Sequence, residues 1–294
     1  MKPVARPVWM VGVAVALTLG VLWAVVSGSP APRHDGRTVG AWLERLDPLP
    51  SRAADRDEAV AALEALGARA VPGLRAILRV RGYGWFHRTE ELLVRCRILP
   101  APALSLSERK ARAAQAAWML AEKQGVDISP LVPALRHAMV HTRPLAAHFG
   151  RALVRSGPDG VAVLIQLLGA SDPRVRDHAG WALALDEASL RQPGAHEALL
   201  AAIPGETDPR VAANWVLYLS KFRGVGDGPR QVALGLRFLE STNVMDRWAG
   251  AELLGAHAGV PEARSALEAL AADPELKVRS AATRGLAGIA PGRP

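Results

Sequence analysis

The chain of 294 residues contains one cysteine, so no disulfide bond can form within it. This residue, Cys96, follows Leu92, Leu93 and Val94 in an apolar stretch with helical spacing. A cysteine in such a stretch is typically a small buried side chain. A reactive thiol needs a neighbouring base and electropositive surroundings, and the sequence offers no convincing pair. A disulfide-free chain is compatible with either a reducing or an oxidising compartment.

Signals of β-structure and of catalysis are also scarce. No run of residues alternates between apolar and polar with a period of two between turn residues. Aromatic residues make up 5% of the chain, while half of it is hydrophobic and alanine dominates the apolar segments. The chain has no Gly-x-Ser-x-Gly, no His-Glu-x-x-His and no phosphate-binding loop. We therefore expect an all-α protein that is not an enzyme.

Eight histidines raise the question of a metal site. His137 and His141 are four residues apart, which would place both on one helical face, and His148 follows. A zinc site needs three or four ligands with supporting hydrogen bonds, and no carboxylate occurs between residues 136 and 151. Arg136, Arg143 and Arg151 would also repel a cation. We predict surface histidines, with no metal and no cofactor.

A weakly repeated segment runs through most of the chain. Each copy has a start position, a small or apolar residue four positions later and a Leu eight positions later, a spacing that defines one helical face. The clearest copies are Val175/Ala179/Leu183, Val211/Trp215/Leu219, Met245/Ala249/Leu253 and Val278/Ala282/Leu286. Weaker copies are Leu145/Phe149/Leu153, Arg112/Ala116/Leu120 and Glu58/Ala62/Leu66. Starts separated by 36, 34 and 33 residues indicate a stacked helical solenoid.

A second apolar helical segment precedes each of the clearer copies, at 161–168, 199–203, 232–239 and 267–270. The turn between the two segments begins with Asp172-Pro173, Asp208-Pro209 or Asp273-Pro274. An Asp at this point can cap the incoming helix, and Pro suits the first helical position because no N–H is needed there. Each of these three aspartates is therefore a predicted helix cap.

The Asp-Pro-Arg-Val-Arg turn and the paired helices resemble the HEAT-repeat family over residues 38–290. The resemblance implies a right-handed α-α superhelix of about seven helix pairs, whose second helices line a concave groove. It also implies that Asp172, Arg176, Asp177, Asp208, Asp273 and Arg279 cap and bridge successive repeats. Such proteins usually bind partners, although some HEAT-like proteins are lyases or DNA glycosylases, and no fragment here singles out either group.

The first residues have a different character. Lys2 and Arg6 precede an uncharged apolar run at 8–26, long enough to cross a membrane, with Trp9 and Trp23 near its ends. We expect a transmembrane or signal-anchor helix at 1–27, a linker at 28–37, the solenoid at 38–290 and a tail at 291–294. Positive charge before the run predicts a cytoplasmic N-terminus and an extracytoplasmic solenoid. The alternative is a cleaved signal peptide and a secreted protein.

The net charge is +8, and its clearest local excess lies where the repeat period fails, at 80–107. This insertion interleaves basic and aromatic residues, which are Arg81, Tyr83, Trp85, Phe86 and Arg88. Such a pattern can bind nucleic acid. An exported domain would more readily meet anionic lipid or an acidic protein, so we predict no nucleic-acid partner. An additional helix with a solvated basic face is the simpler interpretation.

Positions two, three and six after each start should face the groove that the resemblance implies. The candidate partner-binding residues are Gln115, Trp118, His148, Arg151, His178, Trp181, Asn214, Arg247, Trp248 and Arg284. Tryptophan recurs among them, and Trp with Arg and His neighbours is typical of a binding hot spot. The alternative is that these tryptophans fill space in the core beside Ala and Gly.

These patterns together predict a membrane-tethered scaffold or adaptor that holds a protein or peptide in the groove of the solenoid. Two alternatives stay open. One is an enzyme or an enzyme accessory subunit of the HEAT-like lyase type. The other is a structural component of the cell envelope.

Overall fold

The computed structural model describes residues 32–46, 53–80, 104–142, 146–222 and 224–288. These ranges are helical apart from turns and one small hairpin. The α-helices are α2 (Val39–Arg45), α3 (Ala53–Leu66), α4 (Val71–Arg79), α6 (Leu106–Gln124), α7 (Val132–His141), α8 (Ala146–Arg155), α9 (Pro158–Leu167), α10 (Pro173–Leu183), α11 (Glu187–Leu190), α12 (Ala195–Ala202), α13 (Pro209–Ser220), α14 (Gly228–Leu239), α15 (Val244–Ala256), α16 (Pro261–Ala269) and α17 (Leu276–Leu286). Short 3₁₀ turns are η2 (Gly67–Ala70), η3 (Ser129–Leu131), η5 (Ile203–Gly205) and η6 (Leu270–Ala272).

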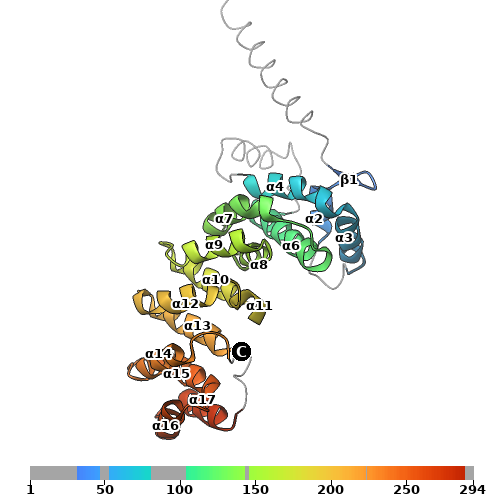
Figure 1. Cartoon of the computed structure of the whole chain (residues 1–294). Helices are drawn as coiled ribbons and strands as arrows, with labels where there is room; N and C mark the ends of the chain where they lie inside the picture. The colour runs from blue at the N-terminus through green and yellow to red at the C-terminus, as the bar shows by residue number, and fades with distance from the viewer. Residues whose placement is uncertain (1–31, 47–52, 81–103, 143–145, 223, 289–294) are drawn as a thin grey trace, which may run out of the picture.

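The helices pack largely in sequence-adjacent pairs, which form two layers stacked in chain order (Figure 1). In one layer α6, α8, α10, α13, α15 and α17 contact one another in succession. In the other layer α4, α7, α9 and α12 contact in succession, and α14 contacts α16. This arrangement is all-helical and consistent with a helical repeat, as the sequence pattern predicts.

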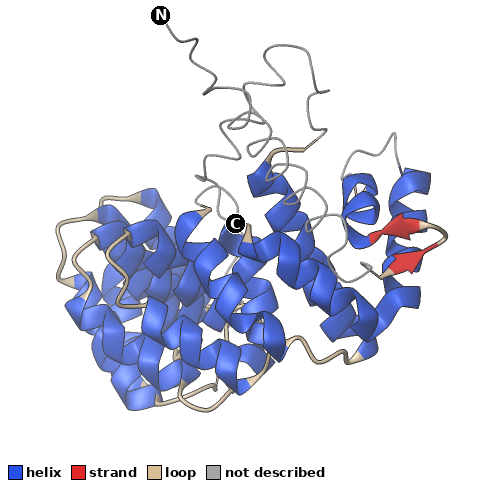
Figure 2. Cartoon of the chain, turned by 90° about the horizontal axis from the view of Figure 1, so that it is seen from above, coloured by secondary structure: helices blue, strands red, loops and turns tan. Residues whose placement is uncertain are grey.

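The first described residues form a hairpin within the segment expected to be a linker. Strands β1 (Arg33–His34) and β2 (Arg37–Thr38) are antiparallel, and Asp35 and Gly36 turn between them with φ of 47° and 73°. An Asp-Gly pair with positive φ at both positions is the preferred two-residue hairpin turn. The hairpin lies against the first helices, α2 and α3 (Figure 2). The Trp42 indole donates to the carbonyl of His34 at 3.2 Å. Trp42 itself is buried, with 1% of its surface exposed.

The predicted helical face is buried from its second position onwards. Residues four and eight after each start are buried in the described copies, with Leu286 half-buried as the exception. The starts are less uniform, because Val175, Val211 and Val278 are buried whereas Glu58 and Met245 are exposed. The expectation that Met245 begins a buried face is wrong. Helix α15 begins at Val244 after the N-cap Asn243, so Met245 lies in its first turn, where it is exposed.

Two of the three predicted aspartate caps are confirmed. Asp172 accepts from the N–H of Arg174 at 2.9 Å, and Asp208 accepts from the N–H groups of Arg210 and Val211. The third prediction is wrong, because Glu275 is the N-cap of α17 and Pro274 lies before the helix. Asp273 still accepts from the N–H of Glu275 at 2.8 Å, but its side chain is buried against Arg247.

Two predicted features lie outside the described residues. These are the apolar run at 8–26 and residues 81–103, which hold Arg81, Tyr83, Trp85, Phe86, Arg88 and Cys96. Among the helices that the structure describes, none combines the length and apolar character needed to span a bilayer.

Candidate partner-binding face

Three successive helices of one layer, α6, α8 and α10, bring the first candidate residues together. Small residues allow these helices to pack closely: a Cβ added to Gly150 of α8 would lie 2.8 Å from the Cβ of Ala182 on α10. Ala113, Ala116 and Ala117 are buried on α6. Larger side chains at these positions would push the helices apart and would therefore separate the candidate residues that the helices carry.

Arg151 of α8 lies between two tryptophans from the neighbouring helices. Its guanidinium carbon is 5.9 Å from the ring centre of Trp118 on α6 and 5.3 Å from that of Trp181 on α10. We call these three residues the Trp–Arg–Trp ladder. Each contact is of the cation–π type, worth about 0.5–1 kcal/mol at an exposed site. All three side chains are half-buried, so the tryptophans belong neither wholly to the core nor wholly to solvent.

A second row of polar residues lies one helical turn before the ladder. Gln115, His148 and His178 each precede a ladder residue by three positions, which puts them on the same helical faces. Nδ1 of His178 lies 2.6 Å from the carbonyl of Arg174, so this nitrogen carries the proton and donates. Burial, together with the charge of Arg151, lowers the pKa of His148. The lowered pKa favours the neutral form of His148, so the positive charge next to it comes from Arg151.

Arg151 has no acidic partner within ion-pair distance among the described residues. This distinguishes it from the other partly buried arginines of its neighbourhood. Arg155 binds Asp186, and Arg176 binds Glu206 through two nitrogens at 2.6 and 2.8 Å. The ladder thus holds an oriented guanidinium whose hydrogen-bonding edges are not used by a carboxylate of the fold.

Asn214 of α13, another candidate, belongs to a cluster around Asp177. The carboxylate of Asp177 accepts hydrogen bonds from Asn214 at 3.1 Å, from the Tyr218 hydroxyl at 3.1 Å and from Arg210 at 3.0 Å. Burial raises the pKa of Tyr218, and the charge of Asp177 adds to the increase. This cluster joins α10 to α13, so the amide of Asn214 is already engaged within the fold.

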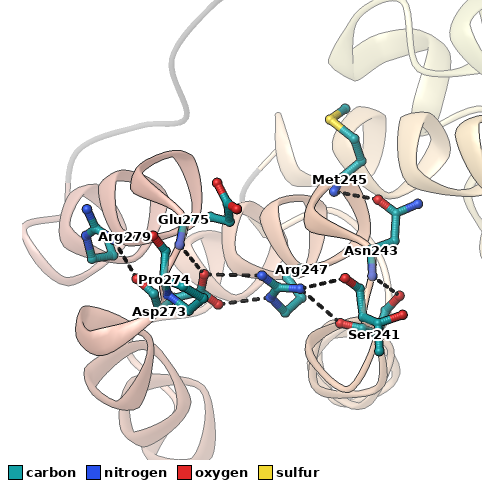
Figure 3. A network of polar contacts seen from close by, with 9 residues as sticks. Ser241, Asn243, Met245, Arg247, Asp273, Pro274, Glu275 and Arg279 are labelled. Carbon is teal, nitrogen blue, oxygen red and sulfur yellow. Dashed lines mark hydrogen bonds and ion pairs between the residues drawn. The ribbon is translucent and has the colours of Figure 1, made fainter.

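Arg247 is also engaged within the fold, as Figure 3 shows. Its Nη1 donates to the carbonyls of Ser241 and Thr242 at 3.3 and 3.0 Å, in the turn before α15. Its other two nitrogens bind the Asp273 carboxylate at 2.9 and 3.3 Å. The candidate Arg247 therefore ties two successive turns together.

Trp248 and Arg284, the remaining candidates, share one buried carboxylate. Oε1 of Glu252 accepts from the Trp248 indole at 3.1 Å and from Arg284 at 2.6 Å. The Nζ of Lys277 lies 3.4 Å from the centre of the Trp248 ring. The ring of Trp248 is thus covered by a lysine, while the rings of the ladder flank an arginine.

The sequence pattern missed a buried polar group in the C-terminal half. Gln231 of α14, 1% exposed, lies 2.7 Å from Nε2 of His196 on α12 and 2.7 Å from Nε2 of His257 after α15. We call these residues the His–Gln–His triad. Burial lowers the pKa of both histidines. The 35-residue separation of His196 and Gln231, close to one repeat, is the signal that could have predicted this contact, whereas the 26-residue separation of Gln231 and His257 gives no such signal.

The histidine pair considered for metal binding forms a stack, with ring centres of His137 and His141 4.2 Å apart. Within the described ranges, no group of three or more His, Cys, Asp or Glu side chains could hold a metal ion.

Comparison with known proteins does not add a function. No protein-family model matches the chain, and no curated protein is significantly similar to it.

Proposed function

We propose that this protein is a HEAT-like scaffold that binds a protein or peptide partner on the face formed by α6, α8 and α10. In this proposal its helix pairs, about seven, form a right-handed superhelix. The observation that carries the proposal is the Trp–Arg–Trp ladder, which presents two half-buried indoles and an arginine without an acidic partner. Trp and Arg are the residue types that most often dominate binding energy at interfaces.

The way in which Arg151 is held supports binding. A free arginine side chain loses up to about 2 kcal/mol of conformational entropy when a partner fixes it. The cation–π contacts with Trp118 and Trp181 restrict the side chain beforehand, so less of this loss falls on the binding step. The two rings also supply apolar area that a partner can cover.

The same proposal includes an N-terminal membrane anchor. Residues 8–26 form the membrane anchor and place the solenoid on the extracytoplasmic side, with the N-terminus in the cytoplasm. Full-length protein should then stay in the membrane fraction after a carbonate wash. Release of a shortened soluble form would show instead that the segment is cleaved.

Site-specific photocrosslinking tests the partner-binding face. A photoreactive residue replaces Gln115, beside the ladder, or Asp159, which is exposed on α9 in the other layer. We expect a discrete crosslinked partner from position 115 and none from position 159. Adding Trp118→Ala and Trp181→Ala should reduce the crosslink at least about tenfold, because the main anchors are removed. Trp248→Ala, on α15, is the matched control and should leave it unchanged.

Equal crosslinking from positions 115 and 159 would contradict the proposed face. Circular dichroism of each variant shows whether the helices are retained. A loss of crosslinking counts only in variants that keep the helical signal of the unmodified chain.

A further inference from the structure

We infer that the group recognised at the ladder is a carboxylate flanked by apolar side chains, so that the partner presents an acidic and apolar peptide segment. This inference rests on the proposed function, because it specifies the chemistry of the partner at the same face.

The face around the ladder has positive charge that the described fold does not neutralise. Among the arginines of α8 and α10, Arg155 and Arg176 are neutralised by acidic residues, whereas Arg151 and Arg174 have no acidic partner in the described part of the chain. Arg174, His178 and Trp181 follow one another at spacings of four and three residues on α10, so they share a face. Asp177, the acidic residue of α10, already binds Arg210, Asn214 and Tyr218. The face is therefore positive, because its carboxylates, Glu122 and Asp177, are already bound by Arg155 and Arg210.

The guanidinium of Arg151 has a geometry that suits a carboxylate. The guanidinium is planar and carries its N–H groups in that plane, where they can bind both oxygens of a carboxylate. Because Trp118 and Trp181 stand on either side, the groups next to that carboxylate meet indole surface. Apolar side chains would bury this surface, whereas further charges would lose hydration there.

Nucleic acid is the less suitable occupant. Its affinity depends on many phosphate contacts along a strand, and the face offers two arginines without acidic partners. A single acidic side chain, or a chain terminus, needs only the one oriented guanidinium.

Display of short random peptides tests the inference on the full-length chain in detergent. We expect the unmodified protein to enrich sequences in which Asp or Glu adjoins Leu, Ile, Val or Phe. Arg151→Gln should weaken their binding about tenfold or more, since a charge-assisted bidentate contact is lost. Arg151→Glu should instead enrich Lys and Arg. Arg237→Glu, an equal charge change at an exposed position on α14, should alter nothing.

The outcomes separate this inference from the proposed function. Enriched peptides that require Trp118 and Trp181, yet carry no acidic residue or bind the Arg151 variants equally well, would overturn the carboxylate and leave the binding face standing. Enriched peptides that ignore all three ladder residues would overturn both. Displacement of the acidic peptides by single-stranded oligothymidine at equal concentration would identify a nucleic-acid site and also overturn the inference.

Discussion

At the scale of single residues, glycine decides how closely some helices approach. The buried ring of Trp215 on α13 occupies the space where Gly180 of α10 lacks a side chain. A Cβ at Gly180 would lie 2.2 Å from the indole nitrogen and 2.4 Å from Cδ1 of Trp215. A similar contact joins Gly255 of α15 to Gly285 of α17. At both places the missing side chain of a glycine lets two helices approach closely, with the large Trp215 ring opposite one of these glycines.

Replacing Gly180 by Ala should lower the free energy of unfolding by about 1–3 kcal/mol. Overpacking against Trp215 costs about this amount, and it exceeds the gain of up to about 1 kcal/mol from better helix propensity. Urea denaturation followed by circular dichroism measures the change. Gly205→Ala is the control, because an added Cβ there meets no atom within 4 Å. Equal stability of both variants would mean that α10 and α13 pack less tightly than the structure shows.

At the scale of helices, an arginine at the same position of three helices binds the preceding turn. Arg176, Arg247 and Arg279 each lie four residues after the N-cap of their helix. In each case Nη1 donates to the two carbonyls just before the cap, at 2.6–3.3 Å. Arg176 and Arg247 also bind an acidic residue of the next turn, Glu206 or Asp273. These arginines thus bind the turn before their own helix, and two of them also bridge to the next turn.

Arg176→Gln should destabilise the chain by about 2–4 kcal/mol. Burial would by itself raise the pKa of Glu206, but hydrogen bonds from Arg176 and the backbone outweigh it, and the pKa is lowered. Without Arg176 the Glu206 carboxylate, 1% exposed, would be buried without its cation. Thermal and urea unfolding measure the loss. Arg191→Gln, which breaks an exposed pair with Glu187, should cost less than about 1 kcal/mol.

Adding Glu206→Gln to Arg176→Gln gives a second check on this bridge. Because the uncompensated charge disappears, the double variant should recover part of the lost stability. If the double variant is as unstable as the sum of the single variants, the cost lies in the turn carbonyls and not in the buried ion pair.

At the scale of the whole molecule, the His–Gln–His triad links two successive helix pairs, α12 with α13 and α14 with α15. Gln231 donates to the carbonyl of Val225 at 2.8 Å and through the same nitrogen to His196, so Nε2 of His196 must be unprotonated. Protonation of His196 would set two donors against each other. Burial lowers its pKa most strongly, and Arg230 acts in the same direction, while Glu197 and Asp227 act against them.

The triad predicts a loss of stability on mild acidification. The pKa of His196 and His257 is lowered on folding, so the unfolded chain takes up protons first as the pH falls below about 6.5. Their contribution is thus complete above that pH and is lost as the pH falls through the folded-state values. Urea midpoints at pH 7.5 and 5 measure the effect. In His196→Gln/His257→Gln the difference between the two midpoints should shrink; an unchanged difference would assign the acid sensitivity to other groups.

Much of the architecture follows from local sequence. Buried residues at spacings of four and eight, and Asp before Pro, specify helices and their starts without reference to distant residues. The local pattern predicted the wrong N-cap at one turn, which differs from the others. At Asp273 the same Asp-Pro pair precedes the helix, because the aspartate is bound by Arg247 from 26 residues away. The hairpin at 33–38 was missed because two-residue strands are too short to show alternation.

The sequence by itself determined which residues share a helical face, since helix geometry converts spacing into direction. All ten candidate groove residues are half-buried. Only the tertiary structure decided which of these ten residues have polar groups that other described residues of the fold do not bind. Asn214, Arg247 and Arg284 find partners at distances of 26–37 residues along the chain, whereas Arg151 meets two aromatic rings and no carboxylate. Whether a charged side chain is neutralised depends on which side chains the neighbouring repeat places beside it. The sequence of the residue's own repeat does not show this.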